Sequence, residues 1–389
     1  MRAATQPLLP ERRPVRRRVA YGIVSTYPPT RCGLATFTAA LTGGLLELGA
    51  TVGVVRIADG DPCGDPRVLS ELENGVSASI DGAIDSLAGC DVAIVQHEYG
   101  LYGGRDGDEV VEVLRGLPVP SIVVAHTVLR QPTAHQRLVL EEVADAADAV
   151  VVMTEAARRR LCSGFGVDHS KVNTIAHGAT LPAPSEPAMT PRPTLLTFGL
   201  LGQGKGIEWV IDALVDLGDL RPRPRYVVAG RTHPKVAARE GERYREMLTR
   251  RAWSNGVATW VTFDDTYRDV ASLTRMIQAA TVVVLPYDSP DQVTSGVLVE
   301  AVAAGRPVVA TAFPHAVELL AGGAGLLVPH RDPVALASAV RRVLTEPGLA
   351  TSMTAAASRV APSFGWTQIA AQYSDLAEAL IESHAAATA

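Results

Sequence analysis

The sequence has few cysteines, and they form no pattern that points to a metal or a disulfide framework. Four are present in 389 residues, without a CxxC pair or a spacing typical of zinc ligands. No run approaches 18 apolar residues, so no membrane-spanning helix is expected. The first 18 residues contain six arginines but lack the apolar block of a signal peptide, which predicts a disordered basic tail. Reduced thiols in a cytoplasmic protein are the simplest interpretation.

A strong charge of one sign is also lacking. The 36 basic and 41 acidic residues give a formal net charge of −5. This balance provides no overall attraction for nucleic acid or for an anionic membrane, so membrane contact is expected to be peripheral at most. The oligomeric state is not indicated. The length exceeds what one ordinary core accommodates and predicts two domains.

Short β-branched runs alternate with helix-length segments from Val19 onward, which indicates parallel sheets buried on both faces. Five prolines in residues 180–193 interrupt this alternation and predict a linker at 181–193. The sequence therefore predicts two doubly wound, Rossmann-like α/β domains, 19–180 and 194–365, facing across a cleft, with a final segment at 366–389. Strands are expected at 21–25, 52–57, 92–96, 121–125, 150–153 and 172–175, then at 194–198, 226–229, 259–263, 281–285, 308–310 and 325–328. The main expected helices are 35–48, 136–147, 206–217, 240–251, 271–278, 295–304, 333–344 and 366–380.

The most informative segment is residues 286–311, in which a polar loop follows a strand and leads into a short helix. Ser295 and Gly296 open the helix, and its free first-turn amides, including those of Val297 and Leu298, are suited to hold an anion. Glu300 follows about a turn and a half later, where a carboxylate can bind a diol. The pairing fits a sugar nucleotide, with the pyrophosphate at the helix tip and the ribose hydroxyls on Glu300.

A second glycine-rich loop lies between the strand at 194–198 and the helix at 206–217. Gly199, Gly204 and Lys205 supply amides and one positive charge for a phosphate group. The spacing is not that of a P-loop, since Gly206 follows Lys205 and no hydroxyl for magnesium is present. The chain also lacks GxGxxG, which disfavours a dehydrogenase. A mobile glycine hairpin with a solvated lysine is the structural alternative.

Three histidines fall at the predicted carboxyl ends of strands in the first half. His97 and Glu98 follow one strand, while His126 and His177 follow two others. Ligands of parallel α/β sheets bind beyond these ends, so the histidines are expected to share a cleft. A purely structural role for each of them stays open. Gly33, in the first βα turn, either approaches a ligand or only forms the turn.

Two AspGlyAsp triplets, Asp59/Asp61 and Asp106/Asp108, are the sequence's candidates for metal binding. Both lie among glycine and proline residues, where such triplets usually form turns. We therefore expect no metal and no cofactor, with a nucleoside diphosphate sugar as substrate.

Together these features resemble the retaining, two-Rossmann-domain (GT-B) glycosyltransferases of family 4. The resemblance extends from Tyr21 to the last helix, and its specific parts are residues 198–206 and 292–307. It implies that the helix beginning at Trp366 crosses back to the N-terminal domain. It also implies a front-face reaction in which the leaving phosphate takes the acceptor proton, so that no protein nucleophile is required.

The resemblance also implies site roles. Glu300 matches the glutamate that binds the nucleotide ribose, and Lys205 matches the lysine that neutralises the diphosphate. Gln292 stands where a glutamate usually faces the donor sugar. Gly33 matches the N-terminal loop near the phosphate and acceptor, and His126 resembles the histidine near the reaction centre.

Two departures from the family pattern concern charge. Gln292 cannot ionise, although an amide still bonds sugar hydroxyls. Leu200 occupies the place of a common phosphate-binding arginine. Arg231 or His233 is a candidate replacement, with a turn role as the alternative for each.

The expected reaction is metal-independent transfer of a hexosyl group to a hydroxyl acceptor, with the anomeric configuration retained. A soluble saccharide or small polyol is favoured over a lipid as acceptor. The donor base and sugar stay open between GDP-mannose, UDP-glucose and related donors. A sugar-nucleotide epimerase of the same architecture and a non-catalytic sugar-nucleotide-binding protein are the alternatives, and Gln292 is the feature that supports the second.

Overall fold

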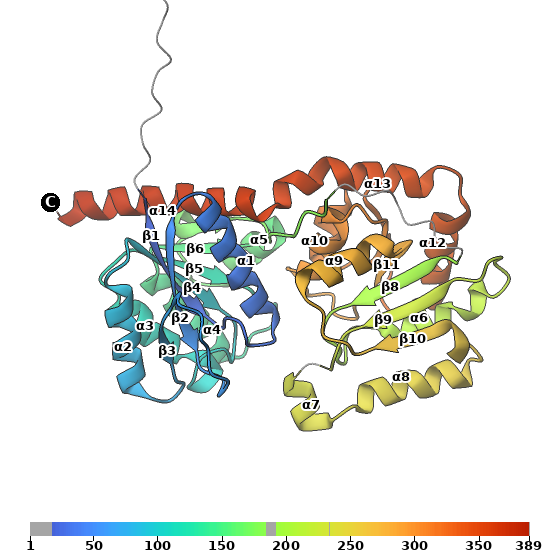
Figure 1. The fold of residues 1–389 in the computed structure, drawn as a ribbon, viewed down its shortest axis with the longest axis horizontal. Helices are drawn as coiled ribbons and strands as arrows, with labels where there is room; N and C mark the ends of the chain where they lie inside the picture. Colours follow the sequence, from blue (N-terminus) through green and yellow to red (C-terminus); the bar gives the residue numbers. More distant parts are fainter. Residues whose placement is uncertain (1–17, 184–191, 233, 389) are drawn as a thin grey trace, which may run out of the picture.

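The computed structural model describes residues 18–183, 192–232 and 234–388 of the chain. Most of the predicted basic tail and the middle of the predicted linker, 184–191, lie outside the described residues, as does His233. Within the described part, the chain forms two α/β domains that lie next to each other (Figure 1). No helix in these segments is long and apolar enough to cross a membrane.

The N-terminal domain is built on a seven-stranded sheet with the order β3-β2-β1-β4-β5-β6-β7. All neighbouring strands are parallel. Its central strands are apolar and buried on both faces, so each layer of helices covers apolar side chains, while the edge strand β3 is partly exposed. They are β1 (Ala20–Ser25), β2 (Thr51–Ile57), β3 (Val68–Leu72), β4 (Val92–His97), β5 (Ser121–Ala125), β6 (Ala149–Val152) and β7 (Val172–Thr174).

The C-terminal domain repeats this plan with six parallel strands in the order β10-β9-β8-β11-β12-β13. In both sheets the order in which strands are added switches sides at the first strand. The first strands extend the sheet to one side of β1 or β8, and the later strands extend it to the other side, starting with β4 or β11. Such switch points leave a crevice at the carboxyl edge of the sheet, where ligands of this architecture bind. The strands are β8 (Thr194–Phe198), β9 (Arg225–Ala229), β10 (Val261–Asp264), β11 (Val282–Leu285), β12 (Val308–Thr311) and β13 (Gly325–Val328).

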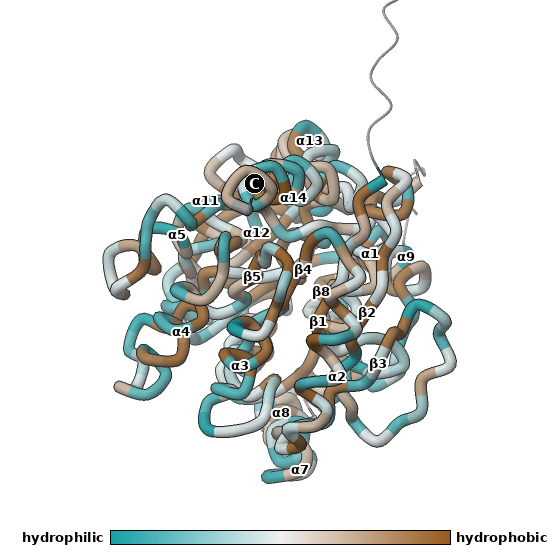
Figure 2. The backbone as a smooth tube through the Cα atoms, turned by 90° about the vertical axis from the view of Figure 1, so that its left-hand side faces the viewer, coloured by the Kyte–Doolittle hydropathy of each residue, from teal (hydrophilic) through white to brown (hydrophobic). Residues whose placement is uncertain are grey.

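Helices cover both faces of each sheet and separate the apolar interior into several clusters. Figure 2 shows the hydrophobic strands at the centre of the N-terminal domain, with the more polar helices around them. The helices of the first domain are α1 (Gly33–Glu47), α2 (Ser77–Leu87), α3 (Glu109–Gly116), α4 (Ala134–Ala146) and α5 (Glu155–Gly164). Those that follow are α6 (Ile207–Ala213), α7 (Pro234–Glu240), α8 (Arg243–Ser254), α9 (Val270–Ala279), α10 (Gly296–Ala303), α11 (Pro314–Leu320), α12 (Pro333–Thr345), α13 (Leu349–Val360) and α14 (Trp366–Thr388).

The last helix, α14, returns to the N-terminal domain and lies beside α1 (Figure 1). Its buried residues Ile369, Ala370, Tyr373 and Ala377 join the apolar cluster of the first sheet. A β-carbon at Gly44 of α1 would lie 2.6 Å from the carbonyl oxygen of Trp366, so the two helices cross closely there. The predicted fold class, including this crossover, is confirmed. The exact domain boundaries stay a prediction.

The expected strands and most expected helices are present within about two residues of their predicted ends. The helix predicted at 206–217 ends at Ala213, and the one predicted at 366–380 continues to Thr388. Three other differences matter. The helix predicted at 240–251 is two helices, α7 and α8, because Gly241 adopts a φ of 63° between them. The strand expected from residue 259 begins at Val261, after a short 3-10 turn. One strand and five helices had no prediction at all, namely β3, α2, α3, α5, α11 and α13.

Candidate functional site

The glycine-rich loop of the C-terminal domain is fixed against the segment that follows β11. The amide of Asp288 donates to the carbonyl of Gly204 at 2.9 Å. Gly206 has a φ of 65°, and a β-carbon there would lie 1.8 Å from the carbonyl oxygen of Pro286. Only glycine permits this backbone conformation and this approach. The loop therefore has a defined path beside the residues that precede α10.

Lys205 points from this loop towards the same segment. Its Nζ atom lies 4.6 Å from the ring centroid of Tyr287, and the side chain is half-buried. Tyr287 is almost fully buried, and its carbonyl accepts from Thr311 at 2.7 Å and contacts His330 at 2.7 Å. A fixed aromatic face thus holds the only positive charge of the glycine-rich loop near the start of the polar loop at 286–295.

The N-terminus of α10 supplies the backbone donors. Ser295 caps the helix, and its Oγ accepts from the amide of Leu298 at 3.3 Å. The amide of Ser295 donates to Nδ1 of His315 at 2.8 Å. The amide of Leu298, a predicted anion donor, is therefore already bonded to the Ser295 cap. The first-turn amides of Gly296 and Val297 remain as the donors suited to an anion.

The glycine-rich loop and the α10 terminus lie next to each other. A β-carbon at Gly199 would lie 3.2 Å from Cγ2 of Val297. The structure therefore places the glycine-rich loop, at Gly199, against the first turn of α10.

Glu300 lies one turn into α10 and faces the interdomain connection. Its Oε1 accepts from the amide of Thr180 at 3.4 Å. Burial raises the pKa of Glu300 to about 7, and the Thr180 amide opposes this rise. Among the described residues no ion pair is formed by this carboxylate, which leaves it suited to accept hydrogen bonds from hydroxyl groups.

Replacing Glu300 with glutamine is expected to change the pH dependence of stability. Because the folded-state pKa is raised from 4.5 to about 7, stability present below pH 4.5 is lost as the pH rises through 7. Glu300→Gln removes this loss, so the variant should be more stable than the wild type by up to about 3 kcal/mol at pH 8. The advantage should shrink towards pH 5. Urea denaturation at pH 5, 6, 7 and 8 measures it, and a pH-independent difference would contradict the assignment.

Gln292 lies in the loop before α10, but its side chain bonds within the loop. Its Nε2 donates to the carbonyl of Thr294 at 2.9 Å. Gln292 is half-buried, so its carboxamide stabilises the loop while part of the residue stays exposed to solvent. Its predicted contact with a donor sugar stays a prediction.

His126 lies at the carboxyl edge of the N-terminal sheet, with its Nε2 atom 2.6 Å from Oε1 of Gln96. Since this oxygen only accepts, Nε2 carries the proton and Nδ1 is left as an acceptor. Burial and the neighbouring histidines lower the pKa of His126 to about 3, so the ring is neutral at physiological pH. Its ring also packs edge-on against Phe37 at 5.0 Å. Sequence reasoning missed Gln96, the residue that fixes this tautomer.

Replacing Gln96 with leucine is expected to lower turnover about 10- to 100-fold, because the His126 ring would lose the contact that sets its tautomer and direction. Binding of a nucleoside diphosphate should be unchanged, since Gln96 lies in the other domain from Lys205 and α10. Steady-state kinetics and calorimetry on the same preparation separate the two effects. Equal losses in both would show that Gln96 serves the fold alone.

His177 connects the two domains at the site. A β-carbon at Gly296 would lie 2.7 Å from Nε2 of His177, so this ring covers the first residue of α10. Its other side contacts Phe37 at 5.1 Å and Trp366 at 5.8 Å. Burial lowers the pKa of His177 to about 4, which keeps it neutral. The structure thus places His126 and His177 around Phe37, next to the α10 terminus.

His97 does not share this cleft, so the expectation of a cleft shared by all three histidines is wrong for His97, and the structural alternative applies to it. The ring is 1% exposed and packs against Tyr99, with centroids 5.3 Å apart. Neither ring nitrogen has a hydrogen-bond partner among the described residues. Glu98 does lie near the His126 loop, because its carboxylate accepts from Thr127 at 2.6 Å.

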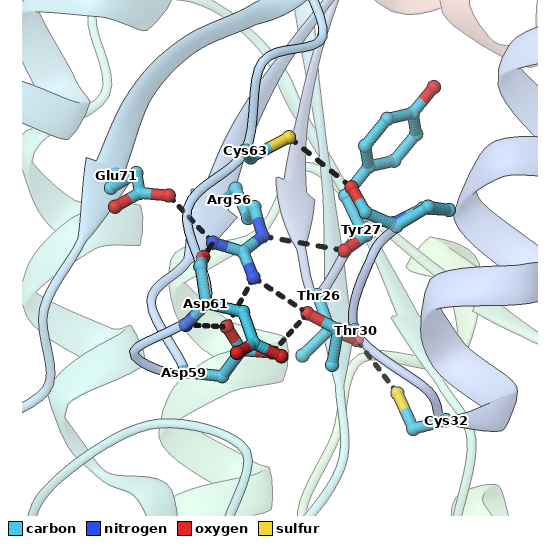
Figure 3. Close-up of polar contacts among 10 residues, drawn as sticks. Thr26, Tyr27, Thr30, Cys32, Arg56, Asp59, Asp61, Cys63 and Glu71 are labelled. Carbon is cyan, nitrogen blue, oxygen red and sulfur yellow. Dashed lines mark hydrogen bonds and ion pairs between the residues drawn. The ribbon is translucent and has the colours of Figure 1, made fainter.

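Gly33 begins α1, and a β-carbon there would meet nothing within 4 Å. The loop before it is held by Arg56, whose guanidinium donates to the carbonyl of Tyr27 at 3.4 Å and to Thr30 at 3.0 Å (Figure 3). The same side chain pairs with Asp59 and with Glu71. Asp59, from the first AspGlyAsp triplet, therefore anchors the loop, and the open space at Gly33 lies at its end.

The other candidates are more peripheral. Arg231 is exposed after β9, and Leu200 is half-buried in the glycine-rich loop. A cavity of about 820 Å³ opens next to this loop, and Gly204 is the single predicted residue that lines it. In the second AspGlyAsp triplet, Asp106 contacts Nδ1 of His135 at 2.9 Å. No cluster of three metal-ligating side chains occurs among the residues that the structure describes.

The C-terminal domain, which contains most of this site, is similar to a known protein family. Residues 192–346, which include Lys205 and α10, match the family described as glycosyl transferases group 1. The C-terminal domain of the chain is therefore similar to group 1 glycosyl transferases over most of its length. The roles predicted for the residues of this domain stay predictions.

Relatives along most of the chain are also glycosyltransferases. The D-inositol 3-phosphate glycosyltransferase of Corynebacterium diphtheriae is 29% identical over 84% of this chain and 80% of its own length. That of Kineococcus radiotolerans is 30% identical over 58% of this chain, and the match spans only 56% of that protein. Anabaena HepE, solved with UDP and glucose, has a TM-score of 0.74 and 16% identity, covering 93% of this chain and 100% of its own. The glycosyltransferase prediction and the GT-B fold are thereby confirmed.

Proposed function

We propose that this glycosyltransferase moves a hexosyl group from a nucleoside diphosphate sugar to a hydroxyl acceptor, with retention and without a metal ion. The observation that carries the proposal is the glycine-rich loop, which contains Lys205, lying against the first turn of α10, where the amides of Gly296 and Val297 are the donors suited to an anion. Glu300 follows on the same helix, where the ribose of a bound nucleotide would meet it. Few other ligands require an anion site and a diol acceptor at this spacing.

The chemistry assigned to these residues is electrostatic. As the bond from the anomeric carbon to the phosphate oxygen breaks, negative charge grows on the diphosphate, and Lys205 and the α10 amides stabilise it. The acceptor oxygen forms its bond on the same face of the sugar and passes its proton to the leaving phosphate. The proposed reaction does not require Gln292 to act as a nucleophile. Neutral His126, with an unprotonated Nδ1, accepts a hydrogen bond from a sugar hydroxyl.

The first donor to test is UDP-glucose, because Anabaena HepE was solved with UDP and glucose. GDP-mannose is the second. The name of the inositol phosphate glycosyltransferases supports a polyol or its phosphate as the acceptor class. A cytoplasmic location fits both substrates, and Cys32, Cys63, Cys90 and Cys162 are all free thiols.

A thermal-shift screen tests donor binding. UDP, GDP, UDP-glucose and GDP-mannose are added to the full chain, and the matching nucleotide should raise its stability by about 2.7 kcal/mol at 100 times its Kd. Release of the nucleoside diphosphate should then depend on an added polyol or polyol phosphate. Binding without release would favour the non-catalytic alternative, and isomerised donor without acceptor would favour the epimerase. No shift with any nucleotide would contradict the proposed function.

A further inference from the structure

Helix α5 of the N-terminal domain is attached to the C-terminal domain at its first turn. The hydroxyl of Thr154 donates to the carbonyl of Val293 at 2.8 Å. The amides of Glu155 and Ala156 donate to the carboxylate of Glu318 at 3.0 and 2.9 Å. The first contact places α5 against the polar loop at 286–295, which precedes α10, and the other two attach it to α11.

Arg160 extends from α5 to the same loop. Its Nη1 donates to the carbonyl of Asp291 at 2.7 Å and to the carbonyl of Val128 at 2.9 Å. Asp291 belongs to the C-terminal domain and Val128 to the N-terminal domain. One terminal nitrogen therefore bonds the backbone of both domains at once.

The two carbonyls belong to the two loops that carry predicted donor contacts. Asp291 directly precedes Gln292, and Val128 follows His126 by two residues. A shift of the guanidinium would move both loops, although Arg160 itself makes no contact predicted for a substrate. The side chain also lies outside the anion site formed by Lys205 and the α10 amides.

The surroundings explain why an arginine is suited to this position. Burial lowers the pKa of Arg160, the carboxylate of Asp291 opposes this, and the nearby Arg130 adds to it. Arg130 itself contacts the side chain of Asp291 at 3.6 Å. A guanidinium stays charged despite this environment, and its planar geometry directs two N–H groups from one nitrogen at fixed angles. A lysine reaches the same place with a single, freely rotating ammonium group.

We propose that Arg160 is a positioning residue that fixes the donor-sugar loop at Gln292 relative to the loop at His126. This inference rests on the proposed function. It adds to that function a contact between the domains that positions the donor sugar. Binding of the nucleotide is assigned to Lys205 and Glu300 and does not depend on this contact. Arg160 does not touch the reacting atoms.

The link is tested first without any substrate, by hydrogen–deuterium exchange on the full chain. Arg160→Ala should raise exchange severalfold in peptides that cover residues 126–130 and 286–295 together, because both lose a shared anchor. Arg159→Ala is the matched control, since Arg159 is the exposed neighbour on the same helix. Unchanged exchange in either peptide of a folded Arg160→Ala would overturn the inference.

The functional test uses UDP and UDP-glucose with the same variants. Arg160→Ala should keep the Kd for UDP within about twofold of the wild type but lose about 100-fold in kcat, as expected for a misplaced sugar. Arg160→Lys should recover part of kcat, and Arg159→Ala should resemble the wild type. Equal weakening of UDP binding and kcat would overturn the positioning role. Should the wild type bind neither ligand, the proposed function fails, and the exchange result still decides the inference.

Discussion

Lys205→Ala is expected to lower turnover of the donor roughly 10²–10³-fold, the usual effect of removing one electrostatic partner of a developing anion. Lys205 is the positive charge that the glycine-rich loop brings beside Tyr287, 4.6 Å from its ring. The loss should appear mainly in kcat, because charge on the diphosphate is larger in the transition state than in the bound donor. Steady-state release of UDP from UDP-glucose, with a polyol acceptor present, measures the effect.

Gln203→Ala is the matched control for Lys205→Ala. Gln203 is exposed in the same loop, two residues earlier, and carries no charge. Its substitution should leave turnover within about twofold of the wild type, since it alters the loop's surface without removing a phosphate contact. A Lys205→Ala protein with unchanged thermal stability and wild-type turnover would remove Lys205 from the phosphate site.

Glu300→Ala is expected to weaken donor binding about 10- to 100-fold. A carboxylate that accepts from ribose hydroxyls contributes about 1.5–3 kcal/mol per charged hydrogen bond, which corresponds to this range. Calorimetric titration with UDP is the most direct measurement, because UDP contains the ribose and the diphosphate but no transferred sugar.

The controls for Glu300→Ala separate the ribose contact from a general loss of negative charge. Glu112→Ala, at an exposed position of α3, removes the same charge elsewhere and should not change the affinity for UDP. Glu300→Gln retains an acceptor oxygen and should bind UDP with intermediate affinity. An unchanged Kd for Glu300→Ala would show that the ribose lies elsewhere.

The segment from β11 to β12 was predictable because each of its features depends on neighbouring residues. The β-branched strand, the Ser295 cap and the turn at Gly305, with a φ of 69°, are local signals. Helix α5 has a threonine cap at Thr154 but a weaker apolar pattern. Only Ala157 and Leu161 of its residues are buried, so its apolar periodicity is weak.

The incorrect placement of His97 has a simple geometric cause. Successive side chains of a strand point to opposite faces, so a shift of one residue exchanges the inner and outer positions. Gln96 therefore reaches His126, while His97 turns into the core against Tyr99. The sequence identified the end of β4 correctly but contains no local signal for which of the two residues faces the cleft.

The remaining site contacts join residues far apart in the chain. Gln96 and His126 are 30 residues apart, and Arg160 and Asp291 are 131 residues apart. Their pairing follows from the strand order of the sheets and from the way the domains meet. Neither is visible in residue spacing, so the sequence alone does not predict these supporting contacts.

A crystal structure of the full chain with UDP tests the central claim most directly. The account predicts that the diphosphate contacts the Nζ atom of Lys205 and the amides of Gly296 and Val297, with the ribose hydroxyls on Glu300. UDP bound away from Lys205 and the α10 terminus would contradict it.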